Sequence, residues 1–367
     1  MLNRKSYSNW MALIFFAMLV ACATPTLEPT PAPTATPALS ALEKIIQAAK
    51  KEGTLNLIAA PREWCGYGAL IENFKTLYGL QVNELNPEAG SLEQLDAIKT
   101  SKSPDVIDVR HQFGPVAQQE GLLQTYKVST WDSIPSDQKD AAGFWYGNYY
   151  GVMIFQINTD IVKNPPQDWN DLLKPEYKAH IALAGDPRSS HQAMMSVYAA
   201  GLASGATPEN AGQAGLDFFA KLKQAGNMVP IAGQAATLAS GGTPIVLRWD
   251  YLAAMERAAL KDNPRIALIV PKSGALAGMY VSAISAFAPH PNAAKLWLEY
   301  LYSDDGQLAI LKSSCRPIRL NDLLQNKKIP ADALAPANAI FSALDHQTSQ
   351  REIIVKNWEK IVGVNVR

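Results

Sequence analysis

Residues 54–60, TLNLIAA, form a short apolar run that follows Gly53 directly and ends at Pro61. A continuous apolar run of this length, bounded by glycine and proline, is typical of a strand that is buried on both faces of a sheet. Residues 42–51, LEKIIQAAKK, have amphipathic spacing and predict a helix that ends at the glycine. The stretch therefore predicts a helix followed by a buried strand.

The same alternation continues as far as residue 109. Helical periodicity in residues 68–78 and 91–100 alternates with strand patterns in residues 80–85 and 104–109. This β-α-β-α-β order is typical of a parallel sheet that is covered by helices.

A long strand is predicted over residues 144–158, and a second α/β block follows it. In that block, predicted strands cover residues 179–184, 243–247, 265–271 and 279–286. Predicted helices cover residues 192–201, 215–226, 251–260, 292–302 and 304–313. The sequence thus predicts an α/β fold that is built from two blocks.

The N-terminus has the composition of an export signal. Arg4 and Lys5 precede an apolar run over residues 10–20, which is shorter than the roughly 20 residues that a membrane-spanning helix needs. The run ends in LVAC, residues 19–22, which resembles the bacterial lipobox. In such signals the peptide is cut before a lipid-bearing cysteine, so we interpret residues 1–21 as a lipoprotein signal peptide and Cys22 as the lipidation site. An ordinary signal peptide with an incidental cysteine and an uncleaved anchor are the alternatives.

Residues 22–40 are interpreted as a tether. Between residues 24 and 40 there are five Pro and five Thr. A segment with so few large apolar side chains cannot bury enough surface to offset the entropy lost on ordering, and its prolines favour the extended polyproline II conformation. We therefore expect this segment to hold the folded part of the chain off a membrane.

Charge and cysteine content limit the classes of function. The chain has 33 Lys and Arg against 33 Asp and Glu, a formal net charge of +0, which argues against nucleic acid as a partner. Apart from Cys22, the cysteines are Cys65 and Cys315, which predict a disulfide in an oxidising compartment; two separate buried thiols are the alternative. Motifs such as Gly-x-Ser-x-Gly and His-Glu-x-x-His do not occur, so we expect no catalysis and no cofactor. An exported hydrolase and an envelope scaffold lipoprotein are remote alternatives.

Five segments together resemble a bacterial extracellular solute-binding protein, the receptor of an ABC importer. They are AAKKEGTLNLIAA (residues 48–60), SPDVIDV (103–109), YYGVMIFQINTDIV (149–162), PPQDWNDLLKPEYKAHIALAGDP (165–187) and APHPNAAKLWLEYLYSDDGQ (288–307). The resemblance extends from residue 41 to about residue 321. It is strongest with the branch of the superfamily that contains ferric-iron, thiamine, polyamine and phosphonate receptors.

The resemblance implies a type II periplasmic-binding fold, in which two lobes joined by a hinge close over one solute in the cleft between them. It implies lobe 1 at residues 41–152, lobe 2 at residues 153–270, and a return to lobe 1 with C-terminal helices at residues 271–367. The receptors of this family deliver their solute to a membrane permease that works with an ATPase. We therefore expect an exported monomer that is lipid-anchored, either on the outer face of the cytoplasmic membrane or in the periplasm.

Ligands of open α/β sheets bind beyond the carboxyl ends of the strands. Applied to the predicted strands and the segments beside them, this rule indicates Arg62, Glu63, Trp64, Arg110, His111, Tyr146, Asn148, Asp186, Arg188, Ser189, Ser190, Arg248, Trp249, Asp250, Tyr251 and Tyr280. Structural roles are the alternative for several of them, such as a helix cap for Ser189 or Ser190 and a turn for Asp186. Arg110 and Arg248 are the strongest candidates, because an arginine directly after an apolar strand needs a partner.

The candidate residues favour an organic anion such as a phosphonate, a sugar phosphate or a carboxylate, because several are arginines and others lie at a predicted helix start. Ferric iron or an iron chelate is the first alternative, with Tyr251, Tyr280 and Asp250 as ligands. Ferric receptors carry an adjacent tyrosine pair late in lobe 2, whereas the tyrosine pair here, Tyr149 and Tyr150, lies at the crossover between the lobes. A polyamine or thiamine is the next alternative, and the arginines argue against such a cation.

Overall fold

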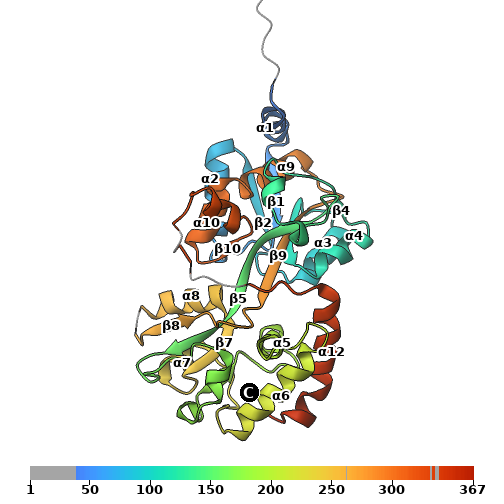
Figure 1. Ribbon diagram of the computed structural model, residues 1–367. Coiled ribbons are helices and arrows are strands. Elements are labelled where there is room, and N and C mark those ends of the chain that lie inside the picture. Colours follow the sequence, from blue (N-terminus) through green and yellow to red (C-terminus); the bar gives the residue numbers. More distant parts are fainter. Residues whose placement is uncertain (1–38, 262, 331–332, 335–338) are drawn as a thin grey trace, which may run out of the picture. The chain divides into compact units, whose positions relative to one another are not determined.

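The computed structural model describes residues 39–261, 263–330, 333–334 and 339–367 (Figure 1). The predicted signal peptide, the predicted lipidation site Cys22 and the predicted tether up to residue 38 lie outside the described residues. Within the described ranges, no helix is both long and apolar enough to cross a membrane.

The described chain begins with the predicted unit of helix and strand. In α1 (Ala41–Glu52) the Ser40 hydroxyl accepts a hydrogen bond from the Glu43 N–H (3.2 Å), and the Glu43 carboxylate accepts one from the Ser40 N–H (2.7 Å). This reciprocal pair satisfies N–H groups that a helix start otherwise leaves free. Gly53 ends the helix at φ 74°, a left-handed conformation that glycine adopts without steric cost, and β1 (Thr54–Ile58) follows.

The predicted parallel sheet is confirmed in this region. β1 pairs in parallel with β2 (Gln81–Leu85) on one side and with β3 (Val106–Arg110) on the other. The connections are α2 (Tyr67–Tyr78) and α3 (Ser91–Thr100), and the shorter α4 (Phe113–Gln119) follows β3.

The long strand β5 (Tyr146–Asn158) connects two halves of one mixed sheet, and all 13 of its residues are buried. Its residues 146–152 pair antiparallel with β9 (Ala277–Ser285), which also pairs with β3. Its residues 153–157 pair with β7 (Ile245–Trp249), and residues 155–158 pair with β8 (Ile266–Ile269). Figure 1 shows β5 passing from the group of elements that contains β1 and β9 to the group that contains β7 and β8.

The remaining elements complete the two halves. The other strands are β4 (Leu123–Gln124), which pairs with β9, β6 (Ile181–Leu183), which pairs with β7, and β10 (Arg316–Pro317), which pairs with β5. The other helices are α5 (His191–Ala203), α6 (Ala211–Gln224), α7 (Ala235–Ser240), α8 (Asp250–Leu260), α9 (Pro291–Leu301), α10 (Asp304–Lys312), α11 (Leu320–Gln325) and α12 (Leu344–Ile361). Short 3-10 helices cover Trp131–Ser133, Ser136–Gln138, Trp169–Leu173 and Pro175–Tyr177. Below, the first half of the sheet means β1–β4, β9 and β10, and the second half means β6–β8.

Helices α5 and α6 pack against each other through two glycines. A methyl group at Gly201 would overlap the carbonyl oxygen of Ala211, and one at Gly215 would overlap that of Val197. The two backbones therefore touch, and α6 begins at Ala211, four residues before the predicted start of this helix.

Helix α12 packs on the same pair of helices, and the sequence patterns did not identify it. The Gln350 amide accepts a hydrogen bond from the Gly212 N–H (2.9 Å) and donates one to the Glu209 carbonyl (2.7 Å). Trp358 is fully buried, with its ring centroid 5.8 Å from that of Phe219 on α6. The C-terminal helix is thus fixed to the helices of the second half.

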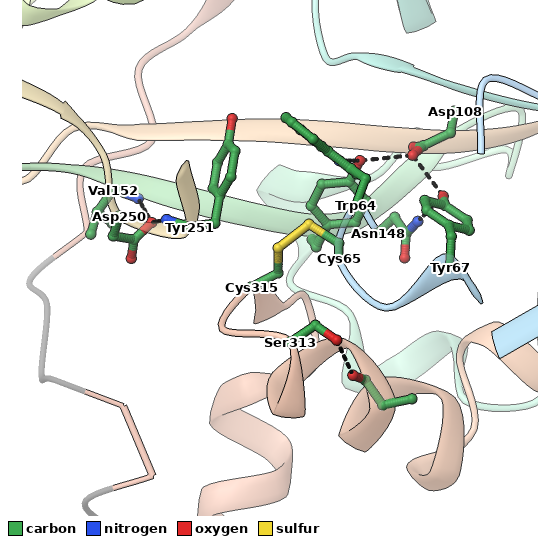
Figure 2. The surroundings of a disulfide bond; sticks show 12 residues. Trp64, Cys65, Tyr67, Asp108, Asn148, Val152, Asp250, Tyr251, Ser313 and Cys315 are labelled. Carbon is green, nitrogen blue, oxygen red and sulfur yellow. Dashed lines mark hydrogen bonds between the residues drawn. A yellow bond between two sulfur atoms is a disulfide. The ribbon is translucent and has the colours of Figure 1, made fainter. Parts of the chain in front are cut away.

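The predicted disulfide between Cys65 and Cys315 is confirmed (Figure 2). It joins the loop before α2 to the segment between α10 and β10, across a sequence separation of 250 residues. Arg316 comes next, and its Nε donates a hydrogen bond to Asp250 Oδ2 at the start of α8 (2.8 Å). Both side chains are buried, and their ion pair links β10 to α8, the helix that follows strand β7 of the second half.

We expect the double variant C65S/C315S to have a free energy of unfolding that is lower by about 2–5 kcal/mol, because a cross-link that closes a long loop restricts the unfolded chain. Urea unfolding followed by tryptophan fluorescence measures the difference. Dithiothreitol should lower the midpoint of the wild-type protein and leave that of the variant unchanged. Equal midpoints for the oxidised wild type and the variant would contradict the expectation.

We expect Gly215→Ala to lower the free energy of unfolding by about 1–3 kcal/mol, because the new methyl group forces α5 and α6 apart. Gly242→Ala is the matched control, since a methyl group there would have its nearest neighbour, the Thr237 carbonyl oxygen, at 3.6 Å. Thermal unfolding of both variants tests the difference, and an equal change in melting temperature would show that the helix contact is not responsible.

Candidate functional site

A cavity of about 360 Å³ is lined by residues from both halves of the sheet. Its walls come from the loop before α2, the end of β3, the start of α5, the turn from β7 to α8, and β9. The chain just before α12 and the first turn of that helix complete the lining. The cavity therefore lies where the two halves face each other.

Five Trp, Tyr and Phe side chains line the first cavity. We call the following residues the aromatic wall: Trp64, Trp249, Tyr251, Tyr280 and Phe341. The Trp64 ring meets Tyr251 edge-on, with 5.0 Å between centroids, and meets Tyr280 at 5.9 Å. Such edge-to-face pairs are the geometry that aromatic rings prefer. Trp249 lies over Gly278, where a methyl group would come within 2.8 Å of the ring, so glycine is needed there.

Trp64 is held by a chain of hydrogen bonds (Figure 2). Its Nε1 donates to the Tyr149 hydroxyl (2.6 Å), which donates to Asp108 Oδ2 (2.9 Å). The Tyr67 hydroxyl donates to the same oxygen (2.6 Å). The neighbouring residue Cys65 carries the disulfide, so Trp64 is fixed on two sides.

Asp108 is buried beneath this chain of hydrogen bonds. Burial raises the pKa of Asp108 to about 7, although hydrogen bonds from Tyr67, Tyr149 and Asn148 oppose the shift. The side chain therefore changes its charge near neutral pH, at a position two hydrogen bonds away from the aromatic wall.

A second cavity of about 350 Å³ adjoins the first. Both cavities share Arg110, Gln112, His191 and Gln347 in their lining. The second cavity adds cationic side chains at Arg188 and Arg351. We call it the basic cavity.

Only part of this positive charge is neutralised by neighbours. Arg188 pairs with Asp186 (2.7 Å) and Glu359 (2.9 Å). In the described part of the chain, neither Arg110 nor Arg351 has a carboxylate within ion-pair distance. These two guanidinium groups are available to a bound anion.

Two histidines line the cavities without adding charge at neutral pH. Burial lowers the pKa of His111 to about 4. Burial also lowers the pKa of His191 to about 4, and the positive charges of Arg110 and Arg351 contribute to this shift. Both imidazoles are therefore neutral at pH 7, and each then offers one N–H donor and one nitrogen acceptor.

The structure brings many of the predicted site residues together. Those in the first cavity are Trp64, Arg110, His111, Trp249, Tyr251 and Tyr280. Those in the basic cavity, besides Arg110, are Arg188, Ser189 and Ser190. Ser190 is also the N-cap of α5, since its hydroxyl accepts a hydrogen bond from the Ala193 N–H (3.3 Å).

Other predicted site residues line neither cavity, because they are exposed or form ion pairs with neighbouring side chains. Arg62 is exposed and pairs with Glu84 (2.6 Å) and Glu72 (3.0 Å), and Glu63 is exposed beside it. Asp186 is engaged by Arg188.

Tyr146 and Asn148 also differ from the prediction, because β5 is buried along its whole length. The Tyr146 ring packs against Tyr302 (4.9 Å between centroids) and Trp131 (5.2 Å). Asn148 Nδ2 donates a hydrogen bond to the Tyr67 hydroxyl (3.1 Å). Both residues belong to the core of the first half.

Arg248 was one of the two strongest candidates, and it does not line either cavity. Its guanidinium is buried, pairs with Glu256 on α8 and donates to the Gly233 carbonyl (2.7 Å). Asp250 likewise faces Arg316 and accepts a hydrogen bond from the Val152 N–H (3.0 Å). Arg248 and Asp250 therefore join elements of the fold.

In the iron alternative Asp250 acts together with Tyr251 and Tyr280. The two tyrosines line the first cavity, whereas Asp250 does not. Among the described residues, no group of three or more His, Cys, Asp and Glu side chains is arranged to hold a metal ion.

The sequence patterns missed the contribution of the C-terminus. Phe341 joins the aromatic wall, and Gln347 and Arg351, four residues apart, project from one face of α12 into the basic cavity. Asp137 in a 3-10 helix also lines the first cavity. The spacing of apolar residues in 344–361 is helical and could have indicated this helix. The signal is weak, because few apolar residues occur there.

Two halves of a mixed sheet that share β5 and enclose a cavity define the type II periplasmic-binding fold. Residues 101–342 match the family described as bacterial extracellular solute-binding protein. The chain belongs to this family, whose members are the receptors of ABC importers.

Relatives with named ligands differ in what they bind. A Salmonella typhimurium protein, provisionally named as a 2-aminoethylphosphonate-binding periplasmic protein, is 24% identical over 258 residues, which are 68% of this chain and 72% of that protein. The Bordetella ferric binding protein has a TM-score of 0.65 at 20% identity and covers 85% of this chain and 100% of its own. AfuA of Actinobacillus pleuropneumoniae, solved with fructose-6-phosphate, has a TM-score of 0.57 at 20% identity and covers 84% and 98%. At these identities, the solved structures establish the fold alone.

We expect Asp108→Asn to change how stability depends on pH. The folded-state pKa of Asp108, about 7, lies above its ordinary value of 3.8, so its contribution to stability is full below about pH 4 and is lost as the pH rises through 7. The difference in free energy of unfolding between wild type and variant should therefore change by roughly 2–3 kcal/mol between pH 5 and pH 8.

Urea unfolding at pH 5, 6, 7 and 8 measures this difference. Asp96→Asn, at an exposed position of α3, is the control and should follow the wild type at every pH. A constant difference between wild type and Asp108→Asn across the range would show that Asp108 does not titrate there.

Proposed function

We propose that the protein captures an organic anion, such as a phosphonate, a sugar phosphate or a carboxylate, and delivers it to the permease of an ABC importer. As a solute-binding protein of such an importer, it works with a permease and an ATPase. The observation that supports an anion is the position of Arg110. It lies at the end of β3, lines both cavities and has no carboxylate partner among the described residues. A charge-assisted contact with an anion supplies the partner that this guanidinium lacks.

The proposal includes the mechanism. The lobes over residues 41–152 and 153–270 close on the solute by bending the strands that join them, and α12 adds to the second lobe. Binding shifts the equilibrium towards the closed form without a chemical step. Lipid on Cys22 and the tether over residues 22–40 keep the receptor, as an exported monomer, close to its permease.

The other candidate solutes serve as competitors in one screen. The protein is heated with methylphosphonate, 2-aminoethylphosphonate, fructose 6-phosphate, citrate, ferric citrate, spermidine and thiamine. A solute that binds only the folded state adds roughly 2.7 kcal/mol of stability when it is present at about a hundred times its dissociation constant. A shift caused by an anion supports the proposal. A shift caused only by ferric citrate, spermidine or thiamine would overturn it.

We expect Arg110→Gln to weaken the binding of such an anion by about tenfold or more, because a hydrogen bond to a charged group contributes on the order of 1.5–3 kcal/mol. Isothermal titration calorimetry measures the dissociation constant. Arg257→Gln removes one positive charge from an exposed position on α8 that lines neither cavity, and it should leave the affinity unchanged. Equal affinities for Arg110→Gln and the wild type would exclude Arg110 from the site.

A further inference from the structure

The two adjoining cavities differ in chemistry. The first has the aromatic wall, and the second has the cationic groups Arg110 and Arg351. Because Arg110, His191 and Gln347 line both, a single solute can extend from one into the other.

The first cavity has room for more than an anionic group, and its five aromatic side chains lie beside polar ones such as Asp137 and Gln192. Its volume of about 360 Å³ lies within the range of roughly 300–1,000 Å³ that is typical of pockets for organic ligands of drug size. The Trp64 ring is fixed by its hydrogen bond to Tyr149 and by the neighbouring disulfide, so the wall is a preformed surface. Rigid aromatic surfaces of this kind can take up another ring in the offset-stacked or edge-to-face geometry that aromatic pairs prefer.

The cationic groups of the basic cavity come from two different parts of the fold. Arg110 ends β3 in the first half of the sheet, and Arg351 lies on α12, which packs against α5 and α6. Both positive charges act on His191, which lies in the lining of both cavities. An anionic group beside His191 would therefore attract both guanidinium groups and draw the first half of the sheet towards α12.

Given the proposed function, on which this inference rests, we infer that the solute is an aromatic organic anion. Its ring lies against the aromatic wall, and its anionic group lies between Arg110 and Arg351 in the basic cavity. Arg351 is then a specificity-determining residue, although no pattern in the sequence distinguishes it from other exposed arginines.

Matched pairs of small molecules test the inference. Titration calorimetry with the oxidised protein compares benzylphosphonate with methylphosphonate and phenylacetate with acetate, and benzyl alcohol is the neutral control. We expect the aromatic member of at least one pair to bind about tenfold or more tightly than its aliphatic partner, and benzyl alcohol to show no binding. Equal or tighter binding of both aliphatic anions would overturn the inference and leave the proposed function standing. Binding of benzyl alcohol as tight as that of the aromatic anions would also overturn it.

Variants on one helix test the anionic end. Arg351→Gln should weaken the binding of the preferred aromatic anion by about tenfold. Lys356→Gln removes one positive charge from an exposed position on the same helix and should leave the binding unchanged. A loss of the same size in both variants would indicate a general charge effect and would exclude Arg351 from the site. If none of the four anions in the series binds, the inference fails. The proposed function fails with it only if no anion of the thermal screen, fructose 6-phosphate and citrate included, causes a shift.

Discussion

The antiparallel pairing of β5 with strands of both halves is the constraint on which the rest of the structure depends. Its residues 146–152 are hydrogen-bonded to β9, and residues 153–157 are hydrogen-bonded to β7. Every residue of the strand is buried, so neither half can leave it without exposing apolar surface and unpaired peptide groups. Relative movement of the halves is therefore confined to bending and twisting of β5 and the strand paired with it where they cross between the halves.

Glycines at the crossing point allow aromatic rings to approach the strands closely. A methyl group at Gly151 of β5 would overlap the Tyr251 ring, and one at Gly278 of β9 would press on Trp249. These two positions are neighbours in the sheet register. Trp249 and Tyr251 of the aromatic wall therefore lie directly over β5 and β9. Trp64 comes from the first half and is held by its hydrogen bond to Tyr149, which is bonded in turn to Asp108.

The sequence could predict features that arise from local pattern, and it could not predict pairings that form only in the folded chain. The alternation of apolar strands and amphipathic helices identified α1 to β3, and the position of Arg110 at a strand end placed it correctly in the cavity lining. The same rule misplaced Arg248. Its partners, Glu256 and the Gly233 carbonyl, come from α8 and from the loop before α7, and they reach it only when these elements pack together. The sequence did not indicate helix α12, because the face that packs on α5 and α6 carries few apolar residues. It makes its contacts through a buried glutamine and a tryptophan.

The disulfide has a consequence for when the site becomes complete. Thiols stay reduced in a bacterial cytoplasm and are oxidised outside it. Until Cys65 and Cys315 are joined, the loop that carries Trp64 lacks its covalent link to the segment before Arg316, which in turn contacts the start of α8. In a chain with free thiols, the candidate site therefore lacks a covalent constraint that it has in the oxidised protein, so oxidation after export would complete the scaffold around Trp64.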